Sequence, residues 1–132
     1  MIVGIGTDIV AIVRMDELWQ RHGEAALERL LGPDEREDCR CATEPGRFLA
    51  KRFAAKEALG KALGTGIRSP VLLNAISVTH DALGKPSFLF SAELKMYIEQ
   101  RNLTTHLSIS DEREPDERIW GSMDVMPKRS PF

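Results

Sequence analysis

The first ten residues of the chain, MIVGIGTDIV, alternate between two kinds of position. Apolar Val3 and Ile5 fall on one face of an extended segment, whereas two glycines and Asp8 fall on the other. An alternation with a period of two predicts a β-strand. Because the two glycines lack side chains, we expect Asp8 to stand beside an open stretch of its own face.

The spacing of apolar residues changes to a helical period after this strand. The segment VRMDELWQRHG predicts a helix that ends at Gly23, because glycine is common just beyond the last helical turn. Shorter helices are predicted in 24–31 and from Pro33, since proline suits the first turn of a helix.

The longest predicted helix contains the sequence RFAAKEALGKALGTG, residues 52–66. Alanine and leucine favour the helix, and the final GTG is a typical end signal. We expect the helix to have two faces, with Glu57 and Lys61 one turn apart on the more polar face. As a solvated pair they would contribute only about 0.3–0.5 kcal/mol. The opposite, apolar stripe contains Ala55, Leu59 and Ala62.

The second half of the chain alternates short strands with one further helix. NAISVTHDALGKPSFLFS predicts two strands joined at Gly84, and Ser91 is a suitable N-cap for the helix AELKMYIEQRN. THLSISDERE predicts a strand with His106 on its polar face, and RIWGSMDVM predicts a last strand. We therefore expect one α+β domain over residues 1–126, followed by a tail at 127–132.

Composition narrows the classes of function. The chain has 132 residues, of which 42% are hydrophobic and 29% charged, and no apolar run approaches the ~20 residues that span a bilayer. Its N-terminus lacks a basic leader, so we expect a cytoplasmic protein without a membrane partner. The net charge of −2 argues against nucleic acid. Cys39 and Cys41 are too close in sequence for an ordinary disulfide, which predicts free thiols.

Few residues remain as candidates for chemistry. GIGTDIV lacks the third glycine of a dinucleotide fingerprint, and GKALGTG lacks the Ser or Thr that follows the lysine of a P-loop. Asp8 and Glu57 could offer two oxygen ligands to Mg²⁺, with Lys61 neutralising phosphates that bind the same ion. Taken singly, Asp8 is also typical of a residue that begins a helix, and His106 of a hydrogen-bonded strand residue.

Four motifs together resemble the holo-acyl-carrier-protein synthase family of 4′-phosphopantetheinyl transferases. They are GIGTDIV near the N-terminus, KRFAAKEALGKALGTG in the middle, GKP at 84–86 and HLSIS near the C-terminus, in family order and spacing. The resemblance implies a mainly antiparallel sheet packed against a long central helix. It also implies transfer of 4′-phosphopantetheine from coenzyme A to a serine of apo-acyl carrier protein for fatty acid biosynthesis, usually by a homotrimer with sites between subunits.

The resemblance also implies a role for each matching residue. Asp8 and Glu57 would bind Mg²⁺, and Lys61 and His106 would contact the coenzyme A phosphates. Attack by a serine hydroxyl on phosphorus needs a proton acceptor, for which we predict Glu57, directly or through a metal-bound water. The remaining implied contacts are the turn Gly84, Lys85 and Pro86 at the adenine end, and docking of the carrier protein on the first helix. Arg14 and Arg21 are seven residues apart on nearly one face of that helix, so we expect them to contact the carrier, with Met15 and Leu18 adding apolar contact. Alternatively, they would only balance Asp16, Glu17 and Glu24 on a solvated helix.

The sequence departs from the family pattern after Ser110. The acidic run DEREP at 111–115 would either lengthen a loop near the site or lie on the solvated surface. Two other classes of function stay open. A Mg²⁺-dependent phosphohydrolase could use the same carboxylates on coenzyme A-like pyrophosphates, and a non-catalytic protein could bind the nucleotide alone.

Overall fold

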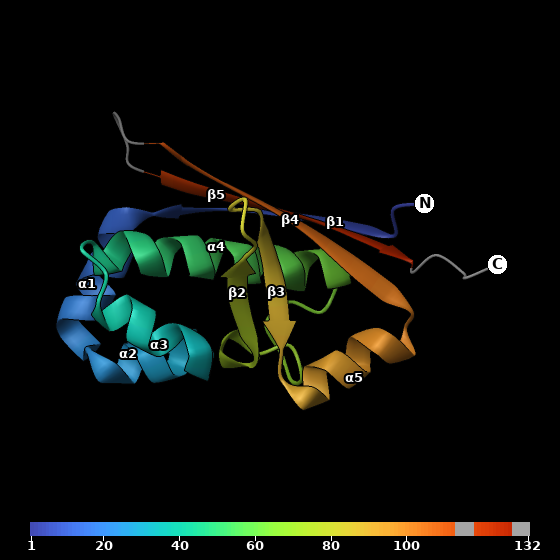
Figure 1. The fold of residues 1–132 in the computed structure, drawn as a ribbon, viewed down its shortest axis with the longest axis horizontal. Helices are drawn as coiled ribbons and strands as arrows, with labels where there is room; N and C mark the ends of the chain where they lie inside the picture. Colours follow the sequence, from blue (N-terminus) through green and yellow to red (C-terminus); the bar gives the residue numbers. More distant parts are fainter. Residues whose placement is uncertain (113–117, 128–132) are drawn as a thin grey trace.

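The computed structural model describes residues 1–112 and 118–127, which form two antiparallel sheets and five α-helices (Figure 1). The three-stranded sheet has the order β1-β5-β4, and the two-stranded sheet pairs β2 with β3. The strands are β1 (Gly4–Ala11), β2 (Ile76–His80), β3 (Pro86–Phe90), β4 (Leu103–Glu112) and β5 (Arg118–Pro127). The helices are α1 (Ile12–His22), α2 (Glu24–Leu30), α3 (Pro33–Arg40), α4 (Pro45–Leu63) and α5 (Ala92–Gln100), with a short 3₁₀ turn at Leu73–Ala75.

The α+β fold class and the elements predicted from the pattern are confirmed. The first helix ends at Gly23, which has φ of 51°, and the long helix ends at Gly64, which has φ of 78°. The Ser91 side chain caps α5 by accepting a hydrogen bond from the Leu94 amide at 3.3 Å. Pro127, the first residue of the predicted tail, belongs to β5. The rest of the predicted tail lies outside the described residues.

The central helix α4 crosses one face of the three-stranded sheet (Figure 1). Glycines on the strands allow this close approach. A Cβ added to Gly4 would collide with the Ala62 carbonyl, and one added to Gly6 would collide with the Ala58 carbonyl. Gly121 of β5 meets the Ala54 backbone in the same way. The alternation of glycine in the first strand therefore lets the helix lie directly against it.

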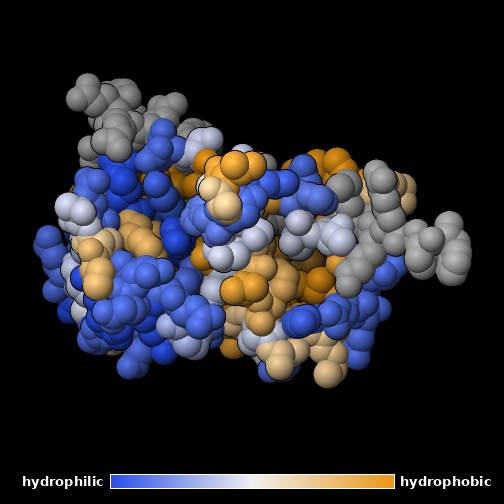
Figure 2. All heavy atoms as spheres, in the orientation of Figure 1, coloured by the Kyte–Doolittle hydropathy of each residue, from blue (hydrophilic) through white to orange (hydrophobic). Residues whose placement is uncertain are grey.

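The other side of α4 is covered by α1–α3 and by the β2–β3 hairpin, so the helix is buried nearly all round. As predicted, Ala55, Leu59 and Ala62 are buried. Lys61 is exposed and Glu57 partly buried, so the helix keeps two faces, although burial extends over most of the rest of its surface. Even Lys56 is completely buried, and Gly60 packs against the Gly66 backbone. In Figure 2, hydrophilic residues dominate the surface over α2 and α3, whereas hydrophobic residues gather over β3 and α5. No helix among the described residues is long and apolar enough to cross a membrane.

Candidate functional site

Asp8 lies on the face of β1 that meets α4, as the alternation predicts. Opposite residues of paired strands share a face, and Asp8 lies opposite Gly121 of β5. The Lys61 ammonium of α4 donates hydrogen bonds to the Thr7 carbonyl at 2.9 Å and to Asp8 Oδ1 at 3.0 Å. The Asp8 side chain is 17% exposed and that of Lys61 52% exposed, so the site opens to solvent on the lysine side.

Glu57 lies one turn before Lys61 on α4 and is partly buried. Burial raises the pKa of the Glu57 carboxyl, the nearby Asp8 carboxylate raises it further, and Lys61 partly offsets both effects. A carboxylate with a raised pKa is a stronger base than an exposed glutamate. The structure therefore brings Asp8 together with Glu57 and Lys61, which follow it by about fifty residues in sequence.

The chemistry of this carboxylate pair fits Mg²⁺. Asp8 and Glu57 are close enough for one carboxylate to shift the pKa of the other, and both offer hard oxygen ligands. Among the described residues, no group of three or more His, Cys, Asp or Glu side chains is arranged to hold a metal. Mg²⁺ is commonly bound by one or two carboxylates together with water and substrate phosphates, so a pair is sufficient.

The Gly84-Lys85-Pro86 turn joins β2 to β3 and borders a pocket of about 120 Å³. Gly84 has φ of 85°, a conformation that favours glycine. The Asp81 carboxylate accepts hydrogen bonds from the backbone amides of Leu83 and Lys85, both at 2.9 Å, and so fixes the turn. The pocket is lined by Lys51, His80, Gly84, Pro86, Ile109 and Asp111.

His106 lies on β4, on the face of the sheet that points away from α4. Its neighbour Leu107 is buried in the core, while His106 is exposed and lies opposite Asp124 of β5. β1 and β4 are the two edges of the three-stranded sheet. Within one chain, Asp8 therefore belongs to one edge, and His106 and the pocket residue Ile109 belong to the other.

The acidic run after Ser110 is partly described. Asp111 is not simply solvated surface, because its carboxylate accepts a hydrogen bond from Arg47 at 2.9 Å and lies 3.7 Å from the Lys51 ammonium. Asp111 and Glu112 are the last residues of β4. Residues 113–115 of the run lie outside the described part of the chain.

Arg14 and Arg21 are exposed on α1, together with Glu17 and the partly buried Leu18. Leu18 also lines a pocket of about 340 Å³ between α1 and α2. The other residues of that pocket are His22, Ala25, Ala26, Arg29 and Leu30. The expectation that Met15 adds to this surface is wrong, because Met15 is 1% exposed and belongs to the core.

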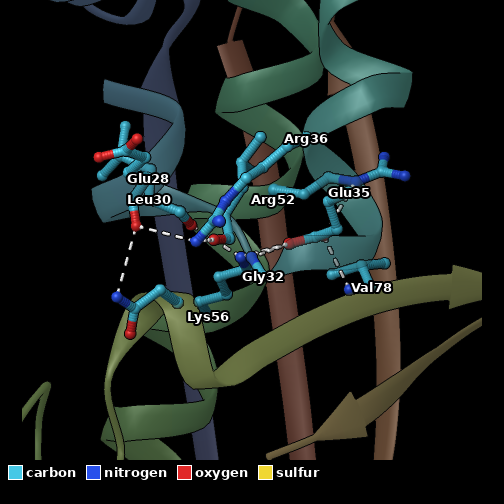
Figure 3. Close-up of polar contacts among 10 residues, drawn as sticks. Glu28, Leu30, Gly32, Glu35, Arg36, Arg52, Lys56 and Val78 are labelled. Atoms are coloured by element: carbon cyan, nitrogen blue, oxygen red, sulfur yellow. Dashed lines mark hydrogen bonds and ion pairs between the residues drawn. The ribbon is translucent and has the colours of Figure 1, made fainter. Parts of the chain in front are cut away.

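Sequence reasoning missed a buried ionic cluster next to the site (Figure 3). The Lys56 ammonium donates hydrogen bonds to Glu35 Oε1 at 2.6 Å and to the Leu30 carbonyl at 2.7 Å. Burial lowers the pKa of Lys56 to about 8, although Glu35 opposes the shift. A signal was present, because Lys56 follows Leu49 by seven residues and so occupies a core position of the helix.

Comparison with known proteins places the chain in one family. The family model of the 4′-phosphopantetheinyl transferase superfamily matches residues 4–114, four residues beyond the last of the predicted motifs. Holo-[acyl-carrier-protein] synthase of Dechloromonas aromatica (strain RCB) is 57% identical over 114 residues, which cover 86% of this chain and 91% of that protein.

Solved structures show the same likeness. The crystal structure of holo-[acyl-carrier-protein] synthase from Neisseria meningitidis has a TM-score of 0.88 and 42% identity, covering 96% of this chain and 99% of that one. The synthase from Bacillus anthracis str. Ames, in complex with CoA (3′,5′-ADP), has a TM-score of 0.77 and 33% identity, covering 97% and 99%. The chain belongs to the 4′-phosphopantetheinyl transferase superfamily and, within it, to the holo-[acyl-carrier-protein] synthase family.

Proposed function

We propose that this chain transfers 4′-phosphopantetheine from coenzyme A to a serine of apo-acyl carrier protein, for fatty acid biosynthesis. The products are holo-acyl carrier protein and adenosine 3′,5′-bisphosphate. The observation that carries the proposal is the set formed by Asp8, Glu57 and Lys61, in a member of a family whose relatives are named for this activity. The two free thiols, Cys39 and Cys41, are consistent with a reducing cytoplasm.

The residues of the set have complementary roles. The serine oxygen forms a bond to the β-phosphorus of the coenzyme A pyrophosphate, and the bond from that phosphorus to the bridging oxygen breaks. Glu57 accepts the hydroxyl proton, which its raised pKa favours. Lys61 neutralises charge that develops on the leaving adenosine 3′,5′-bisphosphate. In the free protein, the Lys61 ammonium donates a hydrogen bond to Asp8, which limits its motion.

Asp8 and Glu57 are the residues that would hold Mg²⁺. A bound Mg²⁺ supplies positive charge that stabilises the pyrophosphate during transfer. Lys61 contacts only Oδ1 of Asp8, so Oδ2 of the same carboxylate would remain available to the ion.

His106 and the Gly84-Lys85-Pro86 turn would complete the site from a neighbouring copy of the chain. His106 belongs to the β4 edge of the sheet, and the turn borders a pocket that β4 also lines, while Asp8 belongs to the β1 edge. Apolar Val3 and Ile5 are more than half exposed on the outer face of β1, which is typical of a surface that another subunit covers. A ring of three chains would join each β1 edge to the next β4 edge, in accord with a homotrimer.

The carrier protein is proposed to dock on α1. Arg14 and Arg21 offer positive charge to an acidic partner, and the apolar pocket beside Leu18 can receive a hydrophobic side chain. This combination of a cationic rim and an apolar pocket is a common form of protein interface.

One assay tests the proposal. The chain is incubated with coenzyme A, Mg²⁺ and apo-acyl carrier protein, and the carrier is weighed by mass spectrometry. A gain of one phosphopantetheine group supports the transferase. Breakdown of coenzyme A without a change in the carrier would indicate a phosphohydrolase, and binding of coenzyme A with neither product would indicate a non-catalytic protein. An Asp8→Ala, Glu57→Ala variant serves as the blank.

A further inference from the structure

Lys56 directly precedes the proposed proton acceptor on α4 and is completely buried. Its ammonium has two short hydrogen bonds, one to the Glu35 carboxylate at 2.6 Å and one to the Leu30 carbonyl at 2.7 Å. Both partners come from outside α4, since Leu30 ends α2 and Glu35 belongs to α3. The side chain therefore ties the middle of the central helix to the helices that cover it.

Glu35 joins further segments at the same point. Its Oε1 also accepts the Gly32 amide at 3.0 Å, and its Oε2 accepts the Val78 amide of β2 at 2.8 Å. The Arg52 guanidinium, one turn before Lys56 on α4, lies 3.3 Å from Oε2. Figure 3 shows these side chains converging from α3, α4, β2 and the α2–α3 connection. The carboxylate is 2% exposed, so water does not replace any of these contacts.

Stability alone is a weak reason for such a cluster. Removing charges from water costs several kcal/mol for each ion, and apolar side chains of similar volume are often equally stabilising. Unlike an apolar contact, an ionic cluster with hydrogen bonds requires each of its side chains to point in a defined direction. Lys56 must point at Glu35 and Leu30 to satisfy its hydrogen bonds, and this requirement fixes the rotation of α4 about its own axis.

That rotation determines where Glu57 lies. Consecutive helical side chains are 100° apart, so Lys56 points to the covering helices. Glu57 lies on the side of β1, one turn before the Lys61 that donates a hydrogen bond to Asp8. A side-chain carboxylate lies roughly 6 Å from the helix axis, so a rotation of about 10° moves it by about 1 Å. A displacement of about 1 Å can lower a catalysed rate by about 100-fold.

We propose that Lys56 and Glu35 are positioning residues, whose ion pair fixes the rotation of α4 and so holds the Glu57 carboxylate beside Asp8. The proposal rests on the proposed transfer reaction, in which Glu57 accepts the serine proton. Both positioning residues are buried, Lys56 completely and Glu35 at 2% exposure, so neither is open to a substrate. Their effect on the reaction passes through Glu57, which makes it separable from a general effect on folding.

A double-mutant cycle tests this dependence. Lys56→Met keeps most of the side-chain volume and leaves Glu35 paired with Arg52. With Glu57 present, we expect Lys56→Met to lower kcat by about 10–100-fold, while KM for coenzyme A and for carrier protein changes by less than about twofold. In a Glu57→Gln background, where only the displacement of Lys61 remains, the same substitution should lower the residual kcat by a smaller factor than it does with Glu57 present. Lys95→Met, an exposed lysine on α5, is the matched control.

The outcomes separate the hypotheses. Equal losses of kcat in both backgrounds would overturn the positioning role, as would a loss that only follows the folded fraction measured by circular dichroism. If Lys56→Met does not fold, the isosteric Glu35→Gln replaces it in the same double-mutant cycle. If neither variant folds, the cluster is required for folding itself, and the proposal is overturned. If the wild-type chain leaves the carrier unmodified, the proposed function itself fails, and this inference fails with it.

Discussion

Gly6→Ala tests the close contact between β1 and α4 on which the site depends. An added Cβ would collide with the Ala58 carbonyl and lie only 2.7 Å from the Ala62 amide nitrogen. Since non-bonded carbon atoms need about 3.5 Å, the helix must move away from the strand by about 1 Å. Lys61 lies between these two helical residues, so its ammonium would move away from Asp8 as well.

Two consequences of Gly6→Ala are expected. Overpacking should lower the free energy of unfolding by about 1–3 kcal/mol, measured by urea denaturation followed by circular dichroism. The displacement of about 1 Å should also lower kcat for phosphopantetheine transfer by about 10–100-fold, measured from the mass of the carrier protein under conditions where the variant is fully folded.

Gly23→Ala is the matched control. Gly23 has φ of 51° and open space around its Cα, so alanine introduces backbone strain of about 1–3 kcal/mol without touching α4. It should lower stability to a similar extent and leave kcat of the folded protein unchanged. Wild-type stability and kcat in Gly6→Ala would refute the view that the glycines set the distance between helix and strand.

Three further outcomes are expected. Lys61→Met should weaken coenzyme A binding by roughly tenfold in calorimetry but leave phosphate-free pantetheine unaffected, and equal losses would indicate a packing role instead. Arg14→Glu with Arg21→Glu should weaken carrier binding and flatten its salt dependence while coenzyme A affinity stays the same, and an unchanged salt dependence would move the docking surface elsewhere. Burial raises the pKa of the Cys39 thiol to about 11, so at pH 8 iodoacetamide should alkylate exposed Cys41 and spare Cys39, as peptide masses would reveal. Because the pKa of Cys39 is higher in the folded state than its ordinary value, its contribution to the free energy of unfolding is complete below pH 9 and is lost as pH rises through 11. Cys39→Ala should remove that part of the pH dependence of stability.

The elements of the fold could be predicted because their signals are local. The period of two in β1, the glycines that end α1 and α4, and the serine that caps α5 all act within a few residues of chain. The orientation of Asp8 followed from the same alternation, since side chains in a strand point to opposite faces. These are features that neighbouring residues determine, whatever packs against them later.

The burial of α4 could not be predicted in this way. A helical projection separates Glu57 and Lys61 from the apolar stripe, but it does not reveal that the sheet packs on one side of the helix and a second layer on the other. In the structure that layer consists of α1–α3 and the β2–β3 hairpin, and it encloses Lys56. The partner of Lys56 is Glu35, twenty-one residues away, and nothing in local sequence specifies such a pairing.

The separation of His106 from Asp8 likewise depends on long-range pairing. The family motifs list both residues as parts of one site, but the strand order β1-β5-β4 assigns them to opposite edges and opposite faces of the sheet. This order is set by the last strand, which inserts between the first and the fourth. A chain that needs both residues in one site must therefore bring together two copies.

Mixing two inactive variants tests that requirement. Asp8→Ala removes the β1-edge half of the site, and His106→Ala removes the β4-edge half, so each variant alone should have little activity. If a site forms between neighbouring chains, a mixture allowed to exchange subunits contains some junctions that join an intact Asp8 to an intact His106. With equal amounts and random assembly in a ring, about one quarter of the junctions have this combination, so activity should recover to about one quarter of the wild-type value. Recovery should require exchange, and covalent crosslinking of each variant before mixing should abolish it. If a single chain forms the whole site, every chain in the mixture carries one lesion and no activity returns, which would contradict a site shared between subunits.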